Sequence, residues 1–329
     1  MSTPRSISIV IPFMDEEGSL EALIVAIKAA LLDYNFNYEI LLVDDGSRDR
    51  GPEIAKRLAV EEAQVRLIRF TRNFGKAAAL MAGFKEASGE YIVTMDADLQ
   101  DDPKEIPRLL DKLDEGYDIV SGWKKDRQDP IGKRLPSKVF NFVVARAFGL
   151  ELHDMNCGLK IYRRDAAAHL RIYGELHRFT PAMLYALGFR VAELPVTHHP
   201  RLQGKSKYGT ARLAKGLLDL VTVILLTRYR ARPLHLFGLI GLPLGFVGFL
   251  ILFYLTVLWF AGLGPIGDRP LLFFGILLIL TGTQLLGTGL IAELVLASEN
   301  NASERYLVAD RVGFSSPDSS TPTKKAKGK

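Results

Sequence analysis

The sequence predicts an α/β protein with a mostly parallel sheet, followed by two membrane-spanning helices. Three observations support this fold class. Short apolar patterns typical of strands alternate with helical patterns over residues 7–122, as in βαβ units. Acidic clusters follow three of the strand patterns. Beyond Pro233, two long runs contain no Asp, Glu, Lys or Arg.

The alternating patterns place the elements of the first part of the chain in order. We expect strands at 7–12, 38–43, 65–70, 91–95 and 118–122, and helices at 20–31, 51–62, 75–87 and from 104 onward. Parallel sheets bind ligands beyond the carboxyl ends of their strands. The acidic clusters at 15–17, 44–45 and 96–102 fall at those ends, so this edge is the predicted site.

The strand at 91–95 runs directly into Asp96, Asp98 and Gln100. Side chains two residues apart point to the same side of an extended chain, so we expect these three to face one space. Carboxylate and amide oxygens suit Mg²⁺ or Mn²⁺, whose remaining ligands are commonly water and substrate phosphates. An acidic turn before a helix that starts at Pro103 would give the same letters, and both interpretations are open at this point.

Glycine-rich phosphate loops are absent from the strand-to-helix turns. Residues 12–18 are acidic and lack Gly-x-Gly-x-x-Gly, and Gly75-Lys76 lacks the upstream glycine of a Walker A loop. A diphosphate bound here would therefore need a cation to neutralise it, with Lys76 as a helper. This requirement favours the metal interpretation of Asp96 and Asp98.

The uncharged runs at 234–267 and 271–292 are long enough to cross a bilayer. The shorter run spans roughly 33 Å as a helix, against a hydrocarbon core of about 30 Å. A buried hairpin in a soluble protein is the alternative. Basic residues lie outside the pair, at 228–232 and 305–329, and the positive-inside rule then predicts both termini in the cytoplasm.

Charge and cysteine content narrow the functional classes. The net charge of +5 with a lysine-rich tail fits an anionic membrane surface, and no aromatic and basic motif points to a nucleic acid partner. Cys157 is the only cysteine, which excludes an internal disulfide. The segment at 1–13 is too short for a signal peptide and is expected to contain the first strand.

Two basic loops, at 123–137 and 198–208, each precede an apolar or amphipathic stretch, at 139–148 and 211–226. We interpret them as segments that meet an anionic head group at the membrane surface. For the first loop, a solvated loop followed by a core helix is the alternative.

Five motifs in order carry a family resemblance: IVIP at 9–12 with Glu16, VDDGS at 43–47 with Asp49, NFGK at 73–76, MDADLQDDP at 95–103, and RLQGKSKY at 201–208. Together they resemble family 2 glycosyltransferases of the GT-A fold. More narrowly, the chain resembles the polyprenyl-phosphate glycosyltransferases, which include dolichyl-phosphate mannose synthases and bacterial bactoprenol glucosyl transferases. The resemblance covers about residues 5–210, and the two spans match the bacterial branch.

The resemblance assigns roles to residues of this sequence. A nucleotide sugar would be held by Pro12, Glu16, Asp44, Asp45, Lys76 and Asp96. The divalent cation, Mg²⁺ or Mn²⁺, would be held by Asp96, Asp98 and Gln100. Asp98 and Asp154 are the implied catalytic residues, with Asp154 near the reacting centre. The lipid phosphate would be bound by Arg127, Arg134, Ser137, Arg201, Lys205, Ser206 and Lys207.

The implied activity is inverting transfer of a hexose, with UDP-glucose favoured, to undecaprenyl phosphate on the cytoplasmic face of the plasma membrane. A GDP-mannose-dependent mannose synthase, a processive polysaccharide synthase and a non-catalytic nucleotide-sugar scaffold are the alternatives. A processive synthase would carry Gln-x-x-Arg-Trp, whereas Trp123 and Trp259 follow Gly122 and Leu258. A homo-oligomer and a flippase that moves the product are further predicted partners.

The predicted domain organisation has four parts. They are a GT-A domain at 1–210, an amphipathic juxtamembrane helix at 211–232, two transmembrane helices at 233–297, and a polar basic tail at 298–329.

Overall fold

The structure is a computed structural model that describes residues 5–125, 148–150, 152–199, 220–225, 227, 229 and 232–298. The chain forms two compact units, Met1–Arg230 and Ala231–Lys329. Each unit is described by itself. The four-part division at residues 210, 232 and 297 stays a prediction.

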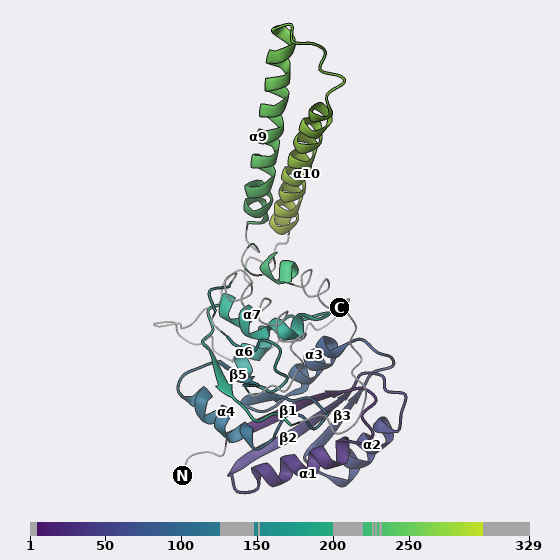
Figure 1. The fold of residues 1–329 in the computed structure, drawn as a ribbon. Helices are drawn as coiled ribbons and strands as arrows, with labels where there is room; N and C mark the ends of the chain where they lie inside the picture. Colours follow the sequence, from purple (N-terminus) through teal and green to yellow (C-terminus); the bar gives the residue numbers. More distant parts are fainter. Residues whose placement is uncertain are drawn as a thin grey trace, which may run out of the picture. The chain divides into compact units, whose positions relative to one another are not determined.

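A seven-stranded sheet organises the first unit, in the order β3-β2-β1-β4-β6-β5-β7. Figure 1 shows β1, β2 and β3 side by side in this sheet. The strands are β1 (Arg5–Phe13), β2 (Phe36–Asp44), β3 (Val65–Arg69), β4 (Tyr91–Thr94), β5 (Ile119–Trp123), β6 (Lys160–Arg163) and β7 (Val191–Pro195). All pairings are parallel except those of β6, which runs antiparallel to β4 and β5. The mostly parallel sheet is confirmed.

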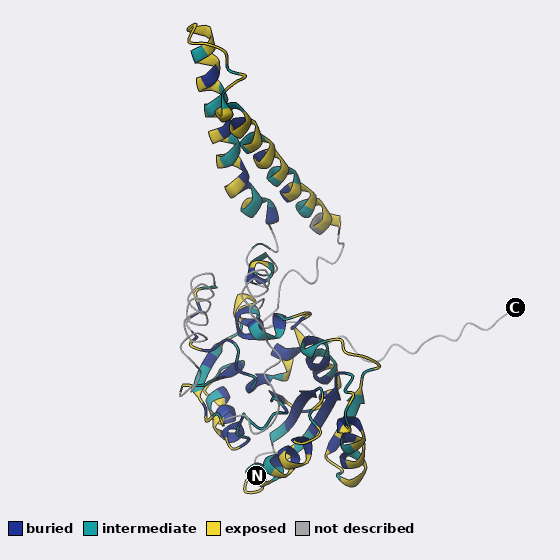
Figure 2. Ribbon diagram, turned by 45° about the vertical axis from the view of Figure 1, so that its right-hand side comes forward, coloured by how far each residue is buried: buried dark blue, intermediate teal, exposed yellow. Residues whose placement is uncertain are grey.

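Helices cover both faces of this sheet, and Figure 2 shows their outer sides exposed and the strands largely buried. They are α1 (Leu20–Leu31), α2 (Gly51–Glu61), α3 (Lys76–Glu86), α4 (Glu105–Asp114), α6 (Arg164–Ala168), the 3₁₀ helix η1 (Leu176–Phe179) and α7 (Thr180–Ala186). The predicted helices after the first four strands are found within one or two residues of their expected bounds.

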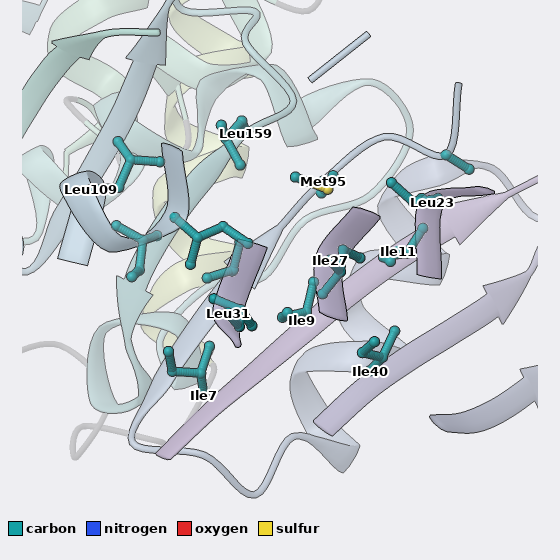
Figure 3. Close-up of a cluster of buried hydrophobic side chains, with 14 of the residues drawn as sticks. Ile7, Ile9, Ile11, Leu23, Ile27, Leu31, Ile40, Met95, Leu109 and Leu159 are labelled. Carbon is teal, nitrogen blue, oxygen red and sulfur yellow. The ribbon is translucent and has the colours of Figure 1, made fainter. Parts of the chain in front are cut away.

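Alternation along β1 creates two cores, because successive strand residues face opposite sides. Ile9 belongs to the core that also contains Leu23 and Ile27 of α1 and Leu109 of α4 (Figure 3). Val10 faces the other side, in a core that includes residues of α3, α6 and α7. Among the described residues, both faces of the sheet are therefore covered, which leaves the ends of the strands as the place for a ligand.

The carboxyl ends of the central strands meet at one edge of the sheet. Pro12 of β1 pairs with Val43 of β2, and Val10 pairs with Thr94 of β4. Because β6 is antiparallel, its first residue, Lys160, lies beside Thr94 at this same edge. The topology thus brings a lysine to the acidic edge that the sequence predicts.

The second unit is an antiparallel pair of helices, α9 (Pro233–Phe260) and α10 (Pro270–Ser298). Both are long and apolar enough to cross a membrane, with mean hydropathies of 2.4 and 1.9. Close backbone approach holds them together, since a Cβ added at Gly241 would lie 2.8 Å from the carbonyl oxygen of Gly282. Most of their large apolar side chains face outward (Figure 2), as expected of a membrane protein and not of a buried hairpin.

Glu39 of β2 joins three segments at the amino-terminal edge of the sheet. Burial alone would raise the pKa of Glu39 from 4.5, but hydrogen bonds from Ser8 and Ser88, with one from Arg66, lower it to about 2. The ionised carboxylate therefore stabilises the fold above about pH 4.5, and this contribution is lost as the pH falls toward 2.

We expect Glu39→Gln to lower the free energy of unfolding by about 1.5 kcal/mol near neutral pH, a value reduced for partial solvent screening. Thermal unfolding of the detergent-solubilised chain at pH 7 and pH 4 measures the effect. The difference in transition temperature between wild type and variant should be smaller at pH 4 than at pH 7. A difference that stays constant with pH would mean that the charge of Glu39 does not contribute.

Candidate active site

The carboxyl edge of the sheet contains a small cavity of about 30 Å³. Three predicted donor-binding residues, Pro12, Lys76 and Asp96, line it together. They come from the end of β1, the first turn of α3 and the second residue beyond β4. The structure therefore brings Pro12 and Asp96 together, although they lie 84 positions apart in the sequence.

Asp96 lines this cavity and pairs with Lys76, which lines it too. Burial alone would raise the pKa of Asp96, but the ion pair with Lys76 outweighs it and holds the pKa well below its usual range. Gly158 lies against the same carboxylate, and a Cβ there would be 2.6 Å from Oδ2 of Asp96. The Thr94 hydroxyl donates to the Gly158 carbonyl at 2.9 Å and fixes this contact.

The extended backbone that the prediction assumed for Asp96, Asp98 and Gln100 is not found, and their convergence on one cation stays a prediction. β4 ends at Thr94, and the chain then turns through Leu99, whose φ is +60°. The backbone N–H of Gln100 donates to Asp98 Oδ1 at 3.2 Å. The side-chain amide of Gln100 donates to the His199 carbonyl at 3.3 Å. The side chains therefore project from a turn, not from an extended strand.

Asp44 and Asp45 extend the acidic edge from the end of β2. Asp45 accepts hydrogen bonds from the backbone N–H groups of Phe74 and Gly75, at 2.7 and 3.1 Å. Asp44 accepts from Ser47 N–H at 2.8 Å and pairs with Arg69 at 3.4 Å. Both carboxylates therefore shape the loops around the cavity, and Asp45 sets the start of α3 and so the position of Lys76. Glu16, the remaining predicted donor ligand, is half-buried and accepts a hydrogen bond from the Ser19 hydroxyl.

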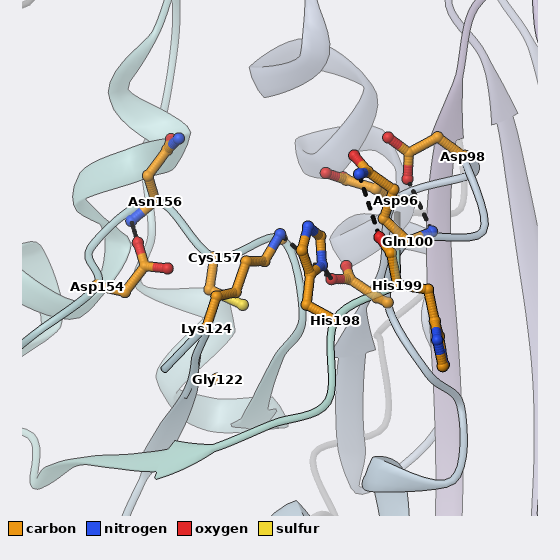
Figure 4. A network of polar contacts seen from close by, with 12 residues as sticks. Asp96, Asp98, Gln100, Gly122, Lys124, Asp154, Asn156, Cys157, His198 and His199 are labelled. Atoms are coloured by element: carbon orange, nitrogen blue, oxygen red, sulfur yellow. Dashed lines mark hydrogen bonds and ion pairs between the residues drawn. The ribbon is translucent and has the colours of Figure 1, made fainter. Parts of the chain in front are cut away.

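Asp154 is buried and lies in the segment that leads into β6. One of its oxygens accepts from the Asn156 N–H at 3.0 Å (Figure 4), and the other has no hydrogen-bond partner among the described residues. Glu193 of β7 holds this segment by accepting from the N–H groups of His153 and Asp154, at 2.9 and 2.8 Å. Asp154 is thus positioned by a carboxylate from a neighbouring strand.

We expect Glu193→Gln to reduce the turnover number about tenfold while KM changes little. A glutamine has one acceptor oxygen, so one of the two N–H groups loses its partner, at a cost of about 0.5–1.5 kcal/mol. The ring of Trp123 stacks on His153 with centroids 4.1 Å apart, so tryptophan fluorescence should change with the same substitution. Unchanged fluorescence and turnover would show that Glu193 does not position this segment.

A second polar network adjoins the site. Lys124 pairs with the buried Asp101 at 3.4 Å, and His198 lies 3.6 Å from the same Asp101 oxygen (Figure 4). Burial and the neighbouring Asp101 raise the pKa of the Cys157 thiol to about 12, so this cysteine is neutral. A β-bridge between Asp101 and His198 ties the loop after β4 to the loop after β7, which leads into the second basic segment.

The predicted lipid-phosphate residues lie outside the described part of the chain. They are Arg127, Arg134, Ser137, Arg201, Lys205, Ser206 and Lys207. Their roles stay predictions.

Several site residues were not singled out from the sequence. Lys160, His177 and Arg178 line the cavity, Gly158 contacts Asp96, and Glu193 holds Asp154. Lys160 carried a usable signal, because a lysine between the apolar residues Leu159 and Ile161 is unusual for a buried strand. The others have no local signal, since only tertiary contact relates them to the site.

Comparison with known proteins identifies the fold and the family. A glucosyl-3-phosphoglycerate synthase from Mycobacterium tuberculosis shares the fold with a TM-score of 0.53 at 21% identity, over 67% of this chain and 80% of that one. The family model described as Glycosyl transferase family 2 matches residues 8–171.

Two curated relatives match nearly the whole chain. A dodecaprenyl-phosphate galacturonate synthase of Rhizobium johnstonii is 40% identical over 92% of this chain and 91% of its own length. An undecaprenyl-phosphate 4-deoxy-4-formamido-L-arabinose transferase of Pseudomonas aeruginosa is 36% identical over 96% and 97%.

The fold of the first unit is that of the GT-A glycosyltransferases. The chain belongs to glycosyl transferase family 2 and, within it, to the polyprenyl-phosphate glycosyltransferases.

Proposed function

We propose that this chain transfers a sugar from a nucleotide diphosphate sugar to the phosphate of a polyprenyl phosphate at a membrane surface. The observation that carries the proposal is the Lys76–Asp96 pair at the open edge of a GT-A sheet, in a chain with two apolar spans. Relatives named for dodecaprenyl and undecaprenyl phosphate support a lipid acceptor.

The residues after β4 fit a divalent cation. Asp96, Asp98 and Gln100 offer hard oxygen atoms from one short turn. Within the described ranges, no three His, Cys, Asp or Glu side chains gather around one point, so a cation here would draw further ligands from water and the diphosphate. Such a cation would supply positive charge to the departing nucleoside diphosphate. A neighbour of the same fold solved with Mn²⁺ and UDP-glucose supports this, and Mg²⁺ is the other candidate.

The proposed reaction is one inverting displacement. An oxygen of the acceptor phosphate bonds to the anomeric carbon, and the bond from that carbon to the diphosphate breaks with its electron pair leaving on the nucleotide. A phosphate monoester has a second pKa of about 6 and is already largely an oxyanion at neutral pH. Asp154 is therefore assigned to positioning and not to proton removal.

The acceptor side of the site is assigned to the two basic loops. Their arginine, lysine and serine side chains would bind the lipid phosphate, as the family resemblance implies. The flanking positive charge places the catalytic unit and both termini on the cytoplasmic side of the plasma membrane in this proposal. A homo-oligomer and a flippase for the product remain part of it as proposed partners.

The proposal names a class of donor and the candidate sugars within and beside that class. The donor is a UDP-sugar, for which UDP-glucose is the first candidate from the sequence resemblance, and GDP-mannose is the alternative. The names of the relatives add galacturonate and 4-deoxy-4-formamido-L-arabinose as sugars to include in a donor screen.

Membranes that contain the full chain, supplied with polyprenyl phosphate and labelled nucleotide sugars, test the proposal. We expect one labelled lipid product that forms only with added Mg²⁺ or Mn²⁺. A growing polymer would indicate a processive synthase. Binding of nucleotide sugar without any product would indicate a scaffold, and either outcome would overturn the proposal.

A further inference from the structure

The cavity beside Asp96 holds more positive than negative charge. Three cations, Lys76, Lys160 and Arg178, line it, and Asp96 is its single carboxylate among the described residues. Lys76 pairs with Asp96, and Arg178 pairs with Glu175 outside the cavity lining. Lys160 is therefore the cavity cation that forms no ion pair with Asp96 or Glu175.

Lys160 is brought to the cavity by the reversed direction of β6. It is 4% exposed, and its ammonium donates to the backbone carbonyl of Cys157. In the part of the chain that the structure describes, no carboxylate forms an ion pair with it. Burial is the main cause that lowers the pKa of Lys160, and the nearby carboxylates of Asp154 and Asp96 offset it only in part. An anion entering the cavity would offset the remaining cost of this burial.

His177 of η1 adds a neutral hydrogen-bonding group to the same wall. Burial, with the nearby cations Lys76 and Arg178, lowers the pKa of His177 to about 3, so its ring is neutral at physiological pH. Its Nδ1 atom is buried without a hydrogen-bond partner among the described residues. A ligand with two acceptor atoms could satisfy this ring and Lys160 together.

We infer that this cavity is a subsite for a carboxylate carried by the transferred sugar, held by Lys160 with His177 and Arg178. The inference rests on the proposed function and replaces UDP-glucose, the candidate from the sequence resemblance, by a nucleotide-activated uronic acid as the donor. The cavity of about 30 Å³ has room for about two water molecules, each needing roughly 10–15 Å³ by the same measure. Two carboxylate oxygens fill such a space, whereas a sugar ring does not fit.

The size and place of the cavity favour the sugar over the diphosphate as the source of the anion. A diphosphate is too large for this space and is assigned to the turn that holds Asp98 and Gln100. A neutral hydroxymethyl group in the cavity would leave the Lys160 charge buried and uncompensated. The site would then reject the neutral sugar by the unpaired charge, not by shape.

Matched donors that differ only at C6 give the direct test. In the full chain with Mn²⁺, UDP-glucuronate is compared with UDP-glucose, and UDP-galacturonate with UDP-galactose, by binding and by transfer to polyprenyl phosphate. We expect the uronate of at least one pair to be preferred by tenfold or more. Preference for the neutral sugar in both pairs would overturn the inference.

The variant Lys160→Met removes the charge at nearly constant volume. We expect it to lose the preference for the uronate, while the affinity for UDP and the transition temperature stay within error or rise slightly. Lys160→Arg should keep part of the preference. As a matched control, Lys112→Met removes a surface lysine of α4 that pairs with Glu115, and should leave the donor ratio unchanged.

The outcomes separate this inference from the proposed function. Equal losses of affinity for UDP, UDP-glucose and the uronates in Lys160→Met would assign the subsite to the diphosphate and overturn the inference alone. A lower transition temperature with an unchanged donor ratio would assign Lys160 a purely structural role. If no donor yields a lipid product, the proposed function fails, and the binding ratios still decide the inference.

Discussion

Replacing Asp98 by alanine is expected to lower the rate of sugar transfer by about 100- to 1000-fold, even with saturating Mn²⁺, the range observed when one group that stabilises developing charge is removed. Asp98 is half-exposed in the turn after β4, where its carboxylate also orients the Gln100 N–H. Removing it would take away a ligand for the cation and loosen the turn that presents the second ligand. Initial rates with a labelled donor measure the loss.

The comparison with Asp154→Asn makes this prediction specific. Asn keeps the size of Asp154 and can still accept from the Asn156 N–H, while it cannot take a proton. If the acceptor phosphate is already an oxyanion, this variant should lose less than about 100-fold, below the usual contribution of a general base. Equal and complete loss in Asp98→Ala and Asp154→Asn at saturating Mn²⁺ would instead make Asp154 essential to the chemistry.

The pattern of apolar residues was sufficient to predict the first five strands, β1 to β5. Residues 7–12, and residues 40–43 within the run at 38–43, are buried on both faces, so these runs stand out as strands of a parallel sheet. β6 gave no such pattern, because it has four residues and begins with the buried Lys160. Its antiparallel pairing depends on contacts with β4 and β5 that are distant in sequence.

Part of the candidate site was predictable because its residues lie at or just beyond the end of a strand. Asp44, Asp45 and Asp96 were found in this way, since the end of a parallel strand marks the ligand edge. An acidic turn after this strand was one of the two open interpretations, but the positive φ of Leu99 was not predicted, because it is unusual for a leucine and has no signature in the sequence. Glu193 and Arg178 reach the site through β7 and η1, so their roles appear only once the chain is folded.

Gly158→Ala is expected to reduce transfer by about 100-fold, because a displacement of about 1 Å at a positioning group can have that effect. The added Cβ would lie 2.6 to 2.9 Å from the three carboxylate atoms of Asp96. The backbone at Gly158 does not require a positive φ, so an alanine can adopt the same backbone conformation. The Asp96 side chain must move instead, and its pair with Lys76 would be disrupted.

The affinity for UDP with Mn²⁺ and the transition temperature distinguish a site effect from a folding effect. We expect weaker UDP binding at a nearly unchanged transition temperature. Gly287→Ala is the control, because a Cβ there meets no atom within 4 Å. In an Asp96→Ala background, Gly158→Ala should weaken UDP binding no further, since the carboxylate it displaces is gone. Additive losses in the double variant would mean that Gly158 acts through the backbone of the segment before β6 and not through Asp96.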